Sequence, residues 1–109
     1  MPNPDPELTP VAWEDMDYLF DAVLETSGSE HVAADTYDGV LKAVEDTTPM
    51  PYSTPSVMGR TGITCDYRWV EHKGWMAFYH VKDNNGILVD RVLCGKSDWV
   101  RALRLTRGR

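Results

Sequence analysis

Hydrophobic residues recur at helical spacing through the first half of the chain and alternate along the second half. Thr9-Pro10 is a favourable helix start, because Thr can cap the first turn and Pro needs no backbone donor there. Acidic residues that suit the positive end of a helix dipole follow at Glu14, Asp15 and Asp17. The apolar stripe that predicts this amphipathic helix consists of Trp13, Met16, Leu19, Phe20, Val23 and Leu24.

A second amphipathic helix is predicted directly after the first. Ser27-Gly28 is typical of a left-handed helix end, and Ser29 can cap the helix that follows. The second apolar stripe consists of Ala33, Tyr37, Val40, Leu41 and Val44. Because only a few residues separate the two helices, we expect them to form an antiparallel hairpin.

The second half of the chain predicts a loop followed by three strands. Residues 47–62 are rich in Pro, Gly, Ser and Thr, which indicates a loop. Alternation then predicts strands over 63–70, 75–81 and 87–94, joined by a polar turn over 71–74 and an Asn-Gly turn over 83–86. In the last strand, strict alternation places Arg91 with Val89, and Asp90 with Val92 on the other face. We therefore expect an α+β fold, with an N-terminal antiparallel helical hairpin packed on a small antiparallel β-sheet.

The length of 109 residues predicts one domain over 1–109. Its proline-rich residues 1–8 would form an irregular segment or an edge strand. Residues 100–109 would form a basic tail, beginning in a short helix capped by Asp98. No apolar run approaches the roughly 20 residues of a membrane span, and the acidic N-terminus does not fit a signal peptide. We expect a cytoplasmic protein whose Cys65 and Cys94 are reduced, with no metal site and no cofactor.

The net charge of −6 is unevenly distributed. The first 50 residues carry 12 acidic side chains and one basic side chain, Lys42, whereas the rest carries five acidic and ten basic ones. An acidic chain argues against a protein that coats nucleic acid. The basic second half still permits a local site for an anionic partner.

The residues from Trp75 to Trp99 resemble the closing hairpin of the RelE/ParE toxin superfamily. There, a strand containing Phe-Tyr-Arg precedes a strand ending Arg-Val-Leu-His-Gly-Arg-Arg-Asp. Phe78-Tyr79 and Arg91 match that pattern, as do Gly95, Lys96 and Asp98. Leu8 to Ala12 is similar to the start of the family's first helix, so the resemblance covers about residues 8–99. His80, Cys94 and Ser97 depart from the pattern.

The superfamily contains two mechanisms, and the fold does not choose between them. RelE-like members cut mRNA on the ribosome, which needs a proton acceptor, cations for the developing phosphate charge and a donor to the leaving oxygen. The resemblance and the chemistry give as candidates Arg68, Lys73, His80, Arg91, Lys96 and Asp98. Met76 occupies the position that resembles the catalytic arginine, and Ser97 occupies that of another basic residue. ParE-like members poison DNA gyrase and need only a binding surface.

The resemblance therefore favours a toxin of a type II toxin–antitoxin system that inhibits gyrase. The alternatives are a ribosome-dependent mRNA endoribonuclease and a non-toxic protein-binding module of the same fold, so whether the chain is an enzyme stays open. The resemblance also implies a cognate antitoxin as partner. We expect it to add a helix or a strand over the aromatic and basic sheet surface and to pair with Arg91 or Lys96.

Overall fold

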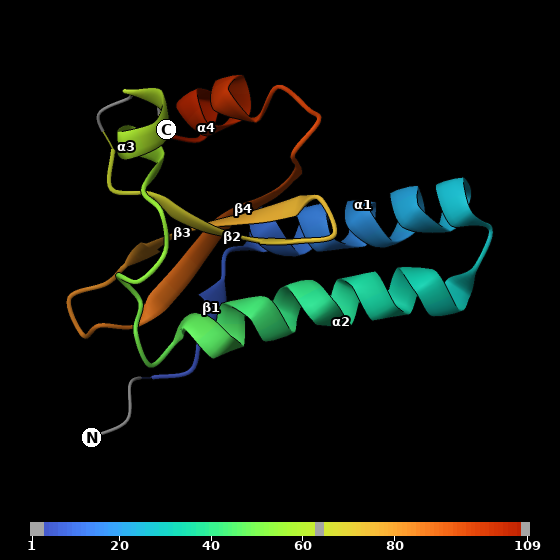
Figure 1. The fold of residues 1–109 in the computed structure, drawn as a ribbon, viewed down its shortest axis with the longest axis horizontal. Helices are drawn as coiled ribbons and strands as arrows, with labels where there is room; N and C mark the ends of the chain where they lie inside the picture. Colours follow the sequence, from blue (N-terminus) through green and yellow to red (C-terminus); the bar gives the residue numbers. More distant parts are fainter. Residues whose placement is uncertain (1–3, 63–64, 108–109) are drawn as a thin grey trace.

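Two long helices form the first layer of the fold. The structure is a computed structural model that describes residues 4–62 and 65–107. Helix α1 runs over Pro10–Ser27 and helix α2 over Glu30–Thr47, and the two lie side by side (Figure 1). The side chains of Thr9 and Ser29 accept hydrogen bonds from backbone amides in the first turns, and Gly28 ends α1 at a φ of 70°. The predicted helical hairpin and its caps are confirmed.

A four-stranded sheet forms the second layer. Its strands are β1 (Glu7–Leu8), β2 (Arg68–His72), β3 (Trp75–Val81) and β4 (Ile87–Cys94), in the spatial order β1-β4-β3-β2. The strands β2, β3 and β4 are antiparallel, whereas the short β1 pairs with β4 in parallel. The predicted α+β class is confirmed, with a mixed rather than a purely antiparallel sheet.

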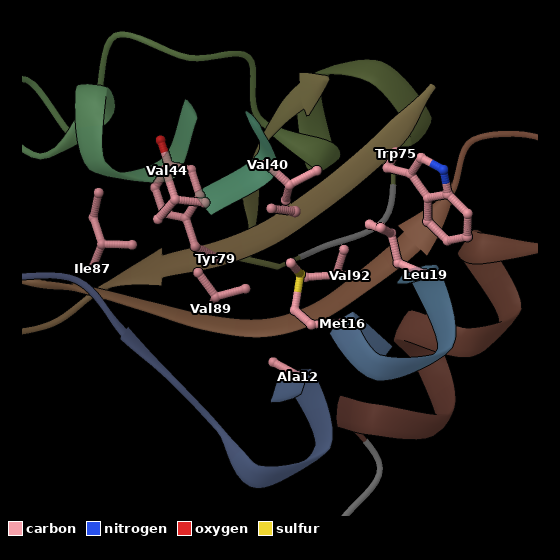
Figure 2. Close-up of a cluster of buried hydrophobic side chains, with 11 residues drawn as sticks. Ala12, Met16, Leu19, Val40, Val44, Trp75, Tyr79, Ile87, Val89 and Val92 are labelled. Carbon is pink, nitrogen blue, oxygen red and sulfur yellow. The ribbon is translucent and has the colours of Figure 1, made fainter. Parts of the chain in front are cut away.

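The main core lies between the helical hairpin and one face of the sheet. Met16 and Leu19 from α1 and Val40 from α2 meet Tyr79 and Val89 from the sheet, and all five are at most 1% exposed (Figure 2). Burial of this many large apolar side chains is the dominant favourable term in folding. It fixes the helical hairpin on this face.

Two further helices cover the opposite face of the sheet. Helix α3 (Val57–Thr61) and helix α4 (Trp99–Arg107) lie on the side of the sheet away from α1 and α2 (Figure 1). The loop predicted over 47–62 is wrong near its end, where α3 forms, whereas the short helix predicted after Asp98 is confirmed by α4. The amphipathic α4 is held by apolar packing, because Trp99 and Leu103 face the sheet. None of the helices in the described ranges is long and apolar enough to cross a membrane.

The strand predicted over 63–70 is wrong at both ends. Strand β2 begins only at Arg68, and it continues to His72, so that the turn consists of Lys73 and Gly74 at φ angles of 50° and 85°. Two successive residues with positive φ make the tight turn that suits the twist of antiparallel strands. Before β2, the Tyr67 carbonyl accepts a hydrogen bond from the Val57 amide, so that this segment bonds to the start of α3. Ile63 lies outside the described residues, as do 1–3 and 108–109 of the two predicted terminal segments.

Candidate functional site

A β-bulge in β4 rearranges the candidate residues of the last strand. Phe78 pairs with Arg91 but Tyr79 pairs with Val89, so Asp90 is an extra residue without a cross-strand partner. An extra residue shifts the side-chain alternation by one position. The predicted alternation of β4 is therefore wrong from Arg91 onward, because Arg91 faces α4 together with Asp90, while Val92 packs in the main core.

Arg91 is held by a carboxylate from helix α1. Its Nε donates to Asp15 Oδ2 over 2.7 Å, its Nη2 to Asp15 Oδ1 over 3.1 Å, and its Nη1 to Thr106 Oγ1 over 3.2 Å. Asp15 Oδ2 also accepts the backbone N–H of Val92 over 2.9 Å, beyond the point where β1 ends. The hydrogen bonds with Asp15 raise the pKa of the Arg91 guanidinium. The role predicted for Asp15, favouring the start of the helix dipole, is wrong, because the first turn of α1 contains no acidic residue.

His80 forms a close pair with the bulge residue. Its Nδ1 lies 2.6 Å from Asp90 Oδ2, and both side chains are largely buried. Burial raises the pKa of the Asp90 carboxyl, and the hydrogen bond from His80 only partly offsets this effect. The Tyr67 ring is 6.4 Å from the imidazole, centroid to centroid. This pair could act as a proton acceptor only if a substrate reached the second imidazole nitrogen.

Arg68 supports the loop before α3. Its guanidinium Nη1 donates to the carbonyl oxygens of Tyr52 and Thr54, and its Cζ lies 5.2 Å from the centre of the Tyr52 ring. The hydroxyl of Tyr79 donates to the Pro51 carbonyl over 2.8 Å in the same loop. Because β-pairing places Arg68 opposite Tyr79, its side chain leaves the sheet on the face of the helical hairpin, away from His80.

Lys73, Lys96 and Asp98 lie at the other end of the sheet. Lys73 is in the turn before β3, and Lys96 follows β4, whose last residue, Cys94, pairs with Trp75. Asp98 accepts a hydrogen bond from the Arg101 amide and thereby caps α4, as predicted. His80 lies five positions after Trp75 in β3, which corresponds to about 16 Å along the strand. The structure therefore does not bring the six candidates together in one site.

Apolar packing covers the middle of the sheet face that carries His80 and Arg91. Met76 is 5% exposed and Phe78 is fully buried beneath α3 and α4. The Trp99 ring stacks on Phe78 with 5.2 Å between their centres. Within the described ranges, no three His, Cys, Asp or Glu side chains gather as metal ligands would.

Comparisons with known proteins agree with this architecture. A family model described as "ParE toxin of type II toxin-antitoxin system, parDE" matches residues 7–99. The chain belongs to the ParE toxin family. It is thus a toxin of the type II toxin–antitoxin class. Among solved structures, it is similar to a chain of the chromosomal ParDE toxin–antitoxin system from P. aeruginosa, with a TM-score of 0.66 and 16% identity, covering 83% of this chain and 94% of the other. No curated protein matches the sequence.

Two structural partners in this ParE-family toxin were missed from the sequence. Asp15 binds Arg91 across 76 positions of sequence, and no local pattern connects such distant residues. Asp90 was assigned only to a face of its strand. The adjacent polar residues Asp90 and Arg91, in a strand that is otherwise mostly apolar, were the available signal for a bulge.

Proposed function

We propose that this toxin inhibits bacterial growth by binding DNA gyrase, without catalysing a reaction of its own. The observation that supports the proposal is the apolar cover over the middle of this sheet face, where Met76, at the position resembling the nuclease arginine, is 5% exposed. A nuclease needs cations and a proton acceptor around one scissile phosphate. A gyrase inhibitor needs only a surface that fits its target.

The bonding of the two arginine candidates argues in the same direction. Arg68 donates to two loop carbonyls, and Arg91 is paired with Asp15 through two hydrogen bonds. Each of these guanidinium groups would have to give up a good partner before it could bind a phosphate, and leaving a partly buried carboxylate unpaired is costly. These arginines thus serve the fold.

Membership in the family gives the toxin a cognate antitoxin as its partner. For such a toxin to meet gyrase on chromosomal DNA, it has to act in the cytoplasm, which is where we propose that it resides. No cofactor is part of this proposal.

Induced expression in bacteria tests the proposal with two readouts from the same culture. We expect DNA breaks trapped in complex with gyrase, while ribosome-bound mRNA stays intact. Rapid mRNA cleavage without gyrase-linked breaks would overturn the proposal in favour of the ribonuclease. Normal growth in the presence of abundant folded protein would favour the non-toxic binding module.

A further inference from the structure

A groove of 560 Å³ lies between α1 and α2 and is lined by residues of these two helices. The rings of Phe20 from α1 and Tyr37 from α2 meet edge-on at 6.4 Å in its wall, and both side chains are partly exposed. Trp13 lies two turns before Phe20 on the same side of α1, and it is 44% exposed. The packed hairpin therefore leaves a strip of aromatic surface accessible to a partner.

Carboxylates rim this groove. Asp17 and Asp21 of α1 and Asp38 of α2 contribute to its lining, and all three side chains are exposed. Burial raises the pKa of the Tyr37 hydroxyl, and the negative charges of Asp17 and Asp38 raise it further. Among the described residues, these three carboxylates have no side-chain hydrogen bond or ion pair, and no basic side chain lines the groove. The groove therefore favours a partner that combines positive charge with an apolar side chain.

Such a surface lies elsewhere on the same chain. Helix α4 exposes Arg101, Arg104 and Leu105 at positions i, i+3 and i+4 of one face, and Leu105 is 60% exposed. Within the described ranges, neither guanidinium has a hydrogen bond, an ion pair or an aromatic ring as its partner. Because α4 and the helical hairpin lie on opposite faces of the sheet, α4 does not reach the groove of its own molecule (Figure 1).

The groove and the exposed face of α4 are complementary in their chemistry. An amphipathic helix that docks in a groove uses side chains at i, i+3 and i+4 spacing as its anchors. A leucine packs well on aromatic rings, and guanidinium groups both stack on such rings and pair with carboxylates. The net charge of −6 on each copy opposes association. Physiological salt screens exposed charges that are more than about 8 Å apart, so the charges in direct contact decide the outcome.

We propose that a second copy of this toxin docks the exposed face of its α4 in the groove between α1 and α2. Leu105 then packs on the rings of Phe20 and Tyr37, and the two exposed arginines of α4 pair with the carboxylates at the rim. Because the groove and α4 are different surfaces on different sides of the molecule, the contact joins copies head to tail and can repeat along a row of molecules. The proposal does not depend on whether gyrase is the target.

Sedimentation equilibrium of the whole purified toxin tests the proposal. We expect the weight-average mass to rise above that of the monomer as the concentration is raised to about 1 mM. It should return towards the monomer value in about 1 M salt, which screens the ion pairs. Arg104→Glu in α4 and Asp21→Lys in the groove should each weaken the association by about tenfold. Both native side chains are exposed, and unchanged thermal unfolding of the variants would show that the fold is intact.

A mixture of the two variants tests the direction of the contact. Each variant alone should remain largely monomeric at concentrations where the parent toxin associates. An equimolar mixture should associate again, because α4 of the Asp21→Lys copy meets the intact groove of the Arg104→Glu copy. A general change in net charge or solubility would not produce this recovery.

Matched variants elsewhere serve as controls. Lys96→Glu changes the net charge as Arg104→Glu does, and Asp83→Lys changes it as Asp21→Lys does, both from exposed positions in turns. These controls should leave self-association within about twofold of the parent value. A toxin that is monomeric at every concentration, equal losses in test and control variants, or a mixture that stays monomeric would overturn the proposal. So would binding of oligoarginine to the groove of a toxin that does not self-associate, which would point to a basic segment of another protein.

Discussion

The effect of Gly39→Ala on the free energy of unfolding should depend on the residue at position 72. It should be destabilising when His72 is present and stabilising when position 72 is Ala. Gly39 lies in α2, and His72 ends β2 next to the turn that carries Lys73. A Cβ placed on Gly39 would meet three atoms of the His72 imidazole, including Cε1 at 2.7 Å. No carbon can occupy that position unless the ring moves. The missing Cβ of Gly39 therefore leaves the space into which the His72 ring packs.

The magnitude follows from two opposing terms. Ala in a helix interior is about 1 kcal/mol more favourable than Gly, whereas overpacking a filled site costs about 1–3 kcal/mol. We therefore expect Gly39→Ala to lower the free energy of unfolding by roughly 1 kcal/mol when His72 is present. In a His72→Ala background, the same change should raise it by about 1 kcal/mol.

Urea denaturation of the four proteins in this double-mutant cycle measures the effect. The parent, both single variants and the double variant should show a coupling of about 2 kcal/mol. An equal change on Gly39→Ala in both backgrounds would refute the packing of α2 on the end of β2.

Three further changes test the contacts around the candidate site. Tyr79→Phe should lower the free energy of unfolding by about 1–2 kcal/mol in urea, because the Pro51 carbonyl loses a buried donor, and an unchanged value would contradict that bond. Asp15→Asn should lower the free energy of unfolding by about 2 kcal/mol in the same assay, since Arg91 loses its charged partner. An unchanged free energy of unfolding would mean that solvent screens the pair. The raised pKa of Asp90 means that its contribution to stability is greatest below pH 3.8 and is lost as the pH rises through the folded pKa. Asp90→Asn, which does not titrate, should therefore gain stability relative to the parent as the pH rises above 3.8, and a difference independent of pH would count against burial of the carboxylate.

The elements predicted correctly are those specified by nearby residues. The caps at Thr9 and Ser29 and the left-handed Gly28 define the two long helices, and the Asn-Gly turn defines the β3–β4 hairpin. Helix α3 was obscured by the prolines before it. Its cap residues, Ser56 and Gly62, were nevertheless present in the sequence.

The hydrogen bonds within the candidate site could not be predicted from the sequence, for a different physical reason. Whether Arg91 is free or paired depends on Asp15, which reaches it only after the helical hairpin has packed on the sheet. The sheet face on which Arg91 lies depends on a one-residue bulge. A single extra residue moves every later side chain of a strand to the opposite face. The resemblance identified the family, but it did not show that this arginine is paired with Asp15.

The most direct test of the proposed function is an assay of purified gyrase with the purified toxin on relaxed plasmid DNA. The proposal predicts that the toxin blocks supercoiling and that detergent then releases linear plasmid from trapped gyrase. Full supercoiling in the presence of excess folded toxin, with cleavage of mRNA on purified ribosomes, would contradict it.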